Sequence, residues 1–236
     1  MKKEEEMRKK IAGFVIAGML VLALGLVSIP AQAEWTFGPV GGYYSPNFGP
    51  INEELDEHGD LYGTDFAFEA GMMYGLALGY NGNSHFGLRL EYNSFESKKS
   101  DDFWSHSVEY SDYWDLDLSL TVTPVILSGI YRFFVFYTGA GVGWFPTEIK
   151  VTGTLESYQA GVLYYGGPVL DSRSASAIGI LGLAGLEYRG GWFFGGLEAR
   201  YIVAEGELED WDLQQILDSK IDLSGFEACV TAGLRF

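Results

Sequence analysis

The sequence predicts an all-β protein, an eight-stranded antiparallel up-and-down β-barrel that crosses a membrane. Three observations lead to this fold class. Beyond residue 33, apolar and polar residues alternate with a period of two in one segment after another, which is typical of strands with two different faces. These segments number eight, an even number. The connections between them alternate between long and short, as in transmembrane β-barrels.

The predicted strands are separated by turns rich in glycine and asparagine. The second strand is the clearest, because Tyr74, Leu76 and Leu78 share one face while small residues stand between them. Pro124 predicts a local break in the fourth strand, and the last strand ends on Phe236. The predicted strands cover residues 35–45, 65–80, 86–93, 114–131, 135–145, 176–188, 192–203 and 224–236. The predicted long loops cover residues 46–64, 96–113, 147–175 and 204–222.

A leader segment precedes the first strand. Residues 11–29 form an apolar run without charges, which follows a charged start and ends before an A-x-A site with the small residues Ala31 and Ala33. This arrangement predicts a secretory signal peptide over residues 1–33, cleaved after Ala33. The alternative is an uncleaved transmembrane anchor, since the run is nearly long enough to span a bilayer. The barrel domain is then residues 34–236.

The charge of the chain excludes some classes of partner. Of the 32 acidic and 15 basic residues, three Glu and five Lys or Arg lie in the first ten positions, so residues 34–236 carry 29 acidic and 10 basic groups, a charge of −19. Such a charge argues against binding to nucleic acid, which requires a basic face. The single cysteine, Cys229, excludes a disulfide scaffold and is expected to be a small buried side chain.

The alternative fold is a soluble eight-stranded barrel of the lipocalin kind, with its apolar face inside. Large aromatic residues near the ends of the apolar faces, such as Tyr80, Phe86, Tyr92, Trp144 and Tyr201, instead suggest the two aromatic girdles of a barrel in lipid. The opposite faces are mostly glycine with a few charges, which fits a crowded lumen better than a solvated surface. The membrane barrel is therefore favoured.

Several runs resemble the strands of small bacterial outer-membrane barrels of the OmpW and OmpA/OmpX kind. They are residues 42–46 (GYYSP), 118–125 (LSLTVTPV), 137–144 (YTGAGVGW) and 185–189 (GLEYR). The resemblance implies a location in the bacterial outer membrane, in contact with lipid and lipopolysaccharide. It also implies insertion by the barrel-assembly machinery, with the terminal Phe236 in the strand that this machinery recognises. These runs are typical of barrel strands and do not specify a function.

Each predicted strand has one apolar face and one polar face, and the charged residues on the polar faces are expected to meet inside the barrel. An eight-stranded barrel is just wide enough for side chains to fill its interior, where charges must be paired or hydrated. We therefore expect a salt-bridged polar lumen, which acts either as a structural plug or as a narrow channel that prefers cations. The predicted lumen cluster is Glu69, Arg89, Glu91, Asp117, Glu187, Glu198, Arg200, Glu227 and Arg235.

The long loops leave two further functions open. An apolar outer mouth could admit a small hydrophobic molecule, as an OmpW-like conduit would require, and its lining would be Trp211 and Leu213 together with Trp104, Tyr113 and Trp114. Long loops could instead support adhesion or contacts with the envelope. The first and last loops are acidic, with Glu53, Glu54 and Asp56 in the first and Glu209 and Asp210 in the last. These carboxylates form a solvated rim or, as the alternative, bind divalent cations.

An enzyme is the other class to consider, because some outer-membrane barrels modify lipid A. Such an enzyme needs a histidine close to a serine and an acid. His58 and His106 are predicted on outer loops, and Ser105 and Ser107 flank His106, but adjacency along a chain does not make a catalytic triad. The sequence predicts no enzyme, no catalytic residues, no metal site and no cofactor.

Overall fold

The computed structural model describes residues 33–49, 51–52, 67–82, 85–106, 110–159, 161–208 and 220–236. Within these residues the chain forms ten β-strands. They are β1 (Glu34–Pro46), β2 (Gly71–Asn81), β3 (Phe86–His106), β4 (Tyr110–Val122), β5 (Val125–Phe133), β6 (Phe136–Gln159), β7 (Val162–Gly190), β8 (Phe193–Leu208), β9 (Lys220–Asp222) and β10 (Gly225–Arg235). Among the described residues, no helix is long and apolar enough to cross a membrane.

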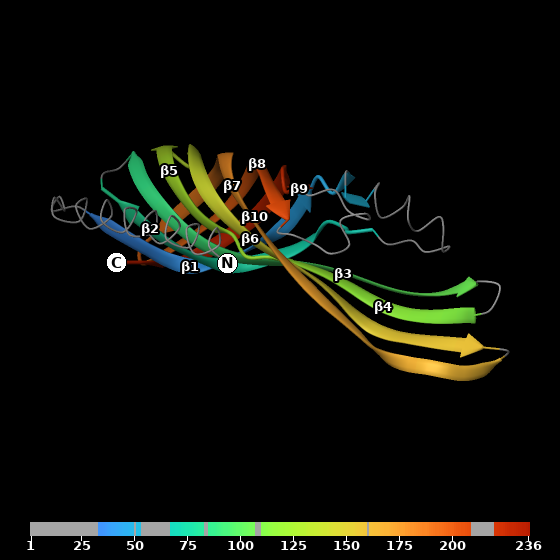
Figure 1. Cartoon of the computed structure of the whole chain (residues 1–236). Coiled ribbons are helices and arrows are strands. Elements are labelled where there is room, and N and C mark those ends of the chain that lie inside the picture. Colours follow the sequence, from blue (N-terminus) through green and yellow to red (C-terminus); the bar gives the residue numbers. More distant parts are fainter. Residues whose placement is uncertain are drawn as a thin grey trace, which may run out of the picture.

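The strands close into a ring in which every neighbouring pair is antiparallel (Figure 1). Strands β4 and β5 are successive parts of one crossing, interrupted at Thr123 and Pro124 as predicted. Strand β10 pairs with both β1 and β8, so eight crossings close the barrel. At the seam, the backbone of Phe236 donates to and accepts from Trp35, at 3.0 and 2.8 Å. The predicted eight-stranded antiparallel fold is confirmed.

Two long hairpins leave one end of the barrel and pair with each other. Residues 96–106 of β3, 110–122 of β4, 147–159 of β6 and 162–174 of β7 form one four-stranded sheet in the order β3-β4-β6-β7. Figure 1 shows this sheet, hereafter the hairpin sheet, running far beyond the ring. The prediction that 96–113 and 147–175 are loops was wrong for most of these residues. Their polar side chains face water on a strand, which composition alone does not separate from a loop.

The other end of the barrel has short turns, hereafter the short-turn end. The turn between β5 and β6 passes through Phe134, which has a positive φ of 57° and is fully exposed. The turn between β7 and β8 uses Gly191, whose φ is 58°. Glycine adopts this left-handed conformation without the strain that a Cβ atom would cause. The predicted alternation of long and short connections therefore separates the two ends of the barrel.

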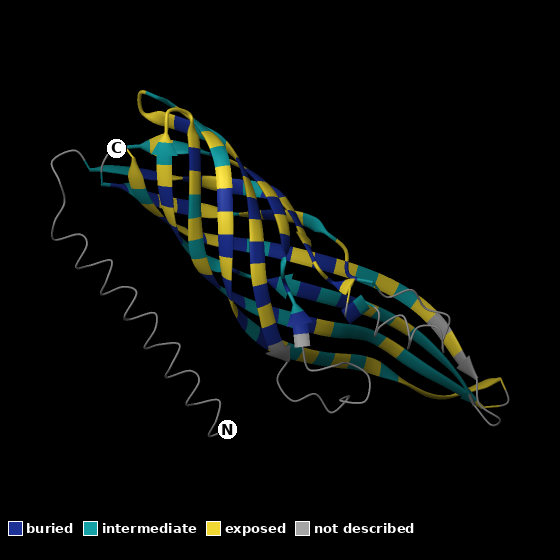
Figure 2. Cartoon of the chain, turned by 90° about the horizontal axis from the view of Figure 1, so that it is seen from above, coloured by how far each residue is buried: buried dark blue, intermediate teal, exposed yellow. Residues whose placement is uncertain are grey.

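Burial alternates along each strand of the ring, and Figure 2 shows this as bands of buried and exposed residues. The residues that face outward from the ring are mainly apolar, as predicted. They include Leu76, Leu78, Leu88, Leu90, Val142, Leu186, Leu197, Val203, Val230 and Leu234, all of which are exposed in the isolated chain. A barrel with its apolar face outside is the inverse of a lipocalin, so this finding favours the membrane barrel over the soluble alternative.

The alternation has the opposite sense on β4. There Leu118, Leu120 and Val122 are buried on the inward face, and Asp117 is exposed on the outward face. The prediction that Asp117 faces the lumen was wrong. This part of the strand lies at the hairpin end, where the outward face carries polar residues and the inward face packs on the core of the protein.

Several predictions concern residues outside those described. These are the signal peptide up to Gln32, the acidic residues Glu53, Glu54, Asp56, Glu209 and Asp210, the residues Trp211 and Leu213 of the apolar mouth, and the histidine His58. The side chain of His106 is also outside the described part. Within it, no group of three or more His, Cys, Asp or Glu residues could hold a metal ion.

Candidate functional site

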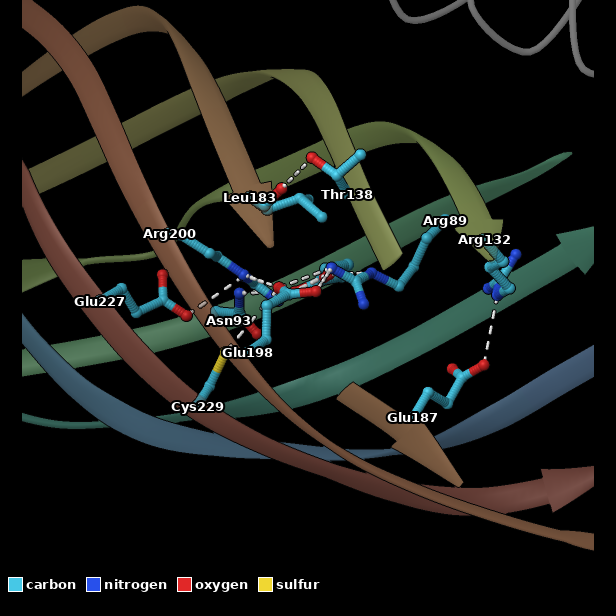
Figure 3. A network of polar contacts seen from close by, with 11 residues as sticks. Arg89, Asn93, Arg132, Thr138, Leu183, Glu187, Glu198, Arg200, Glu227 and Cys229 are labelled. Carbon is cyan, nitrogen blue, oxygen red and sulfur yellow. Dashed lines mark hydrogen bonds and ion pairs between the residues drawn. The ribbon is translucent and has the colours of Figure 1, made fainter. Parts of the chain in front are cut away.

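Five charged side chains meet inside the ring and form the inner cluster. They are Arg89 and Glu91 of β3, Glu198 and Arg200 of β8, and Glu227 of β10. All five are buried, and the side chains of Glu91, Glu198, Arg200 and Glu227 have no exposed surface. Strands β3 and β8 are not neighbours in the ring, so the contacts between them cross the lumen. Figure 3 shows Arg200 between Glu227 and Glu198, with Arg89 facing Glu198.

Each guanidinium contacts more than one carboxylate. Arg89 Nη2 lies 2.7 Å from both carboxylate oxygens of Glu198, and its Nε lies 2.5 Å from Glu91 Oε1. Arg200 Nη2 lies 2.8 Å from Glu91 Oε2, and its Nη1 lies 3.1 Å from Glu227 Oε1. The Nε of Arg200 also donates to Glu198. Such multiple contacts are what buried charges require to offset the cost of leaving water.

The sequence explains why these contacts match. Strand β3 carries Arg89 followed by Glu91, whereas β8 carries Glu198 followed by Arg200. The ring of antiparallel pairs makes β3 and β8 run in the same direction, so an Arg-x-Glu motif faces a Glu-x-Arg motif. Residues two apart on a strand point to the same side. Arg89 therefore lies at the level of Glu198, and Glu91 lies at the level of Arg200, so each charge faces one of opposite sign.

Smaller polar groups extend the inner cluster. Asn93 Nδ2 lies 3.4 Å from Glu91 Oε2, and Cys229 Sγ lies 3.9 Å from Glu198 Oε1. The Arg89 guanidinium lies over the ring of Tyr137, 6.0 Å from its centroid, in cation–π geometry. Cys229 is buried and unpaired with another cysteine, as predicted.

A second group, the rim cluster, lies at the short-turn end. Glu187 Oε1 lies 3.2 Å from Arg132 Nε and 2.5 Å from Arg189 Nε. Glu34 joins Arg189 at 3.3 Å and also accepts a hydrogen bond from Arg235. The inner cluster has three Glu and two Arg, and the rim cluster has two Glu and three Arg. Together they contain five charges of each sign and are neutral.

An apolar layer fills the ring on the hairpin side of the inner cluster. Beyond Glu91 on β3 comes Phe95, and beyond Arg200 on β8 come Ile202 and Ala204, all of them buried. Other buried members are Tyr44, Met73, Leu120, Val122, Phe145, Ile149, Leu181, Ile221 and Leu223. The lumen therefore changes from ion-paired to apolar along its length.

The segment after β1 covers this apolar layer. Phe48, Ile51 and Phe68 are buried against it. The Asn52 side chain holds the segment in place, because its Nδ2 donates to the carbonyl of Phe68 at 2.9 Å and its Oδ1 accepts from the backbone N–H of Phe68 at 2.8 Å. The hydroxyl of Tyr44 donates to the carbonyl of Leu223 across the same layer. The apolar layer thus extends across the hairpin end of the lumen.

The predicted lumen residues divide into three groups. Arg89, Glu91, Glu198, Arg200 and Glu227 form the inner cluster. Glu187 and Arg235 lie in the rim cluster instead. Glu69 precedes β2 and is exposed, with its backbone N–H donating to Ser97 Oγ, and Asp117 pairs with Ser100 on the outward face of the hairpin sheet.

Three members of the rim cluster, Glu34, Arg132 and Arg189, were not predicted from the sequence. Each lies at the end of a strand, at the edge of a turn or of the predicted leader. The closed ring brings these strand ends together. Arg132 and Arg189 come just before the β5–β6 and β7–β8 turns. These two turns lie at the same end of the barrel, and this was the signal in the sequence that the two arginines are close together.

Comparisons with known proteins agree with this architecture. The model of the family described as outer membrane protein beta-barrel domain matches residues 19–215. The chain belongs to the outer-membrane β-barrel family. As an outer-membrane barrel it resides in the bacterial outer membrane, where its outward apolar band contacts lipid. No curated protein sequence matches the chain.

Three solved structures are reported as similar to this chain. Ail, the attachment invasion locus protein of Yersinia pestis, in complex with the heparin analogue sucrose octasulfate, is 12% identical, with 86% of this chain and 97% of that chain covered and a TM-score of 0.44. OprG from Pseudomonas aeruginosa is 11% identical, with 86% and 96% covered and a TM-score of 0.40. Neisserial surface protein A is 10% identical, with 86% and 97% covered and a TM-score of 0.37.

Proposed function

We propose that this outer-membrane barrel is a closed anchor that holds the hairpin sheet outside the cell for contacts with other molecules. One observation carries the proposal: the interior of the ring is filled by buried side chains, while the two longest hairpins are joined into a single ordered sheet. In outer-membrane barrels the short turns lie in the periplasm and the long connections lie outside. The hairpin sheet is therefore assigned to the outer surface.

The inner cluster supports a plug in preference to a channel. An ion path needs charged groups that water can reach, whereas the side chains of Arg200, Glu91 and Glu227 have no exposed surface. The apolar layer adds a second barrier, because an ion crossing it would lose its hydration. The role of the ion pairs is then structural, to hold β3, β8 and β10 together across the lumen.

The hydrophobic conduit is the weaker alternative. Of its predicted mouth, Trp211 and Leu213 lie outside the described residues, while Trp104 and Tyr113 lie on the outward face of the hairpin sheet. The apolar residues that are described inside the ring are packed against one another. A role as an enzyme also finds no support in the described part of the chain, where the charged clusters consist of arginine and glutamate paired with each other. The barrel-assembly machinery as a partner through Phe236, and cleavage after Ala33, remain part of the proposal.

Two experiments test the proposal. Refolded residues 34–236 in a planar bilayer in KCl should give no steady conductance steps, and a Glu227→Gln variant should behave in the same way. Steady cation-selective steps that change in the Glu227→Gln variant would instead support the narrow channel. A gel-shift assay of heat modifiability confirms that each sample is folded.

The second experiment tests which end of the barrel is outside. Thr154 is exposed on the hairpin sheet, and Phe134 is exposed at the short-turn end. A membrane-impermeant maleimide added to intact cells should label Thr154→Cys and leave Phe134→Cys unlabelled. The wild type is the blank, since its Cys229 is buried. Labelling of Phe134→Cys alone would reverse the orientation and contradict the proposal.

A further inference from the structure

The outward face of the hairpin sheet carries an aromatic patch near its tip. Trp104 of β3 is paired in register with Tyr113 of β4, which is paired with Glu156 of β6, so these three side chains cross the sheet in one row. Tyr158 lies in the next row. The Trp104 ring lies 5.0 Å from the Tyr113 ring and 5.7 Å from the Tyr158 ring, measured between centroids. Trp104 nevertheless keeps half of its surface exposed.

Carboxylates border the aromatic patch on the same face. Asp102 of β3 and Asp115 of β4 are in register directly opposite each other, and both are exposed. Like charges in this arrangement destabilise a sheet. Tyr113 Oη lies 3.3 Å from Asp102 Oδ2, and Tyr158 Oη donates to Glu156 Oε2 at 2.6 Å. The aromatic rings are thus held beside three carboxylates, of which the opposed pair Asp102 and Asp115 does not serve the stability of the sheet.

The edges of the hairpin sheet are poor sites for docking another strand. The β3 edge carries Lys98, Lys99 and Asp101, and charged side chains on an edge oppose pairing. The β7 edge carries Pro168, which lacks a backbone N–H. A partner of the sheet is therefore expected to lie on its face, where the aromatic patch is exposed.

We propose that the outward face around Trp104, Tyr113 and Asp115 binds an arginine-rich, extended segment of a partner protein. The proposal rests on the proposed function, because it names the class of partner that the hairpin sheet contacts. A guanidinium stacks on an aromatic face and at the same time donates paired hydrogen bonds to a carboxylate. The row of Trp104 and Tyr113 beside the row of Asp102 and Asp115 offers both contacts about one strand repeat apart.

The chemistry of the patch separates arginine from lysine. Lysine provides a point charge without a planar face, so it would gain from the carboxylates and much less from the rings. General attraction to this acidic chain would favour both cations equally. A preference for arginine that depends on Trp104 is therefore the signature of the proposed surface.

The test uses a fluorescently labelled twelve-residue peptide of alternating arginine and threonine. Its binding to refolded residues 34–236 in zwitterionic detergent is followed by fluorescence anisotropy, with the matching lysine and glutamate peptides alongside. We expect the arginine peptide to bind best and the glutamate peptide not to bind. Trp104→Ala and Asp115→Asn should each weaken binding of the arginine peptide about fivefold, a change typical of one cation–π contact or one exposed ion pair.

Glu148→Gln is the matched control. Glu148 lies on the same face, nearer the barrel, and is paired with Lys150, so this variant removes the same charge as Asp115→Asn away from the patch. It should change binding less than twofold. Equal effects of Glu148→Gln and Asp115→Asn, no effect of Trp104→Ala, or no binding of the arginine peptide would each overturn the proposal. If Thr154→Cys is still labelled on cells and the bilayer stays silent, such a result rejects this partner class and leaves the proposed function standing.

Discussion

The same kind of ion pair occupies two contrasting regions of this molecule. In the ring, Arg200 and its carboxylate partners have no exposed side-chain surface, whereas on the hairpin sheet Lys150 and Glu148 lie 3.1 Å apart with nearly half of each side chain exposed. Water screens the second pair and solvates its members when they separate. The buried charges have no such alternative, so their partners decide whether the barrel is stable. Burial, more than distance, sets what an ion pair contributes here.

The largest expected effect comes from removing the central cation of the inner cluster. Arg200→Met would leave Glu91 and Glu227 buried beside one fewer positive charge. We expect it to lower the free energy of unfolding by about 3–5 kcal/mol, the usual cost of leaving a buried charge without its partner. Urea unfolding in lipid vesicles, followed by tryptophan fluorescence, measures the change. A loss below about 1 kcal/mol would mean that water reaches the cluster.

A somewhat smaller effect is expected in the apolar layer. Leu120 is completely buried, so Leu120→Ala should cost about 2–4 kcal/mol through lost burial and the cavity left behind. Leu170→Ala is the matched control on the hairpin sheet, where the leucine is 78% exposed, and it should be close to neutral. Equal costs for the two variants would show that Leu120 does not pack inside the ring.

Removing a charge from the rim cluster should cost less unfolding free energy than removing one from the inner cluster, and more than removing one from the hairpin sheet. The Arg235 and Glu34 side chains are each about one fifth exposed, so Arg235→Ala should cost about 1 kcal/mol, measured by the same unfolding assay. Lys150→Met on the hairpin sheet should cost less than about 0.5 kcal/mol. If Arg235→Ala were as harmless as Lys150→Met, the rim cluster would not contribute to closing the barrel.

The strands of the ring could be predicted because alternation of apolar and polar residues marks a strand in lipid as it does in water. The direction of that alternation could not be inferred on β4, where Leu118 and Leu120 point inward and Asp117 points outward. The same pattern has the opposite meaning beyond the membrane, because water replaces lipid on the outward face. The hairpin sheet was missed for the same reason, since its polar outward face resembles the composition of a loop.

The candidate site was predicted in part. The alternation along the strands identified all five members of the inner cluster. Alternation shows on which face of the sheet a residue lies, but it does not show how far along the barrel axis the residue lies. Glu69 precedes the paired part of β2, and Asp117 points outward on the hairpin sheet, so neither reaches the inner cluster. The opposite orders of Arg89-x-Glu91 and Glu198-x-Arg200 indicate which residues lie at the same position along the barrel axis. That signal becomes useful only when β3 and β8 are known to run in the same direction.

The most direct test of the closed, ion-paired interior is a double-mutant cycle across the lumen. Arg89→Met, Glu198→Gln and the double variant are unfolded in urea, beside the same cycle for Lys150 and Glu148 on the hairpin sheet. We predict that the Arg89 and Glu198 variants are non-additive by more than about 1 kcal/mol, because each removes the partner of the other, whereas the Lys150 and Glu148 variants are additive within about 0.5 kcal/mol. Additive effects of Arg89→Met and Glu198→Gln would contradict the account, since the two side chains would then not interact across the lumen.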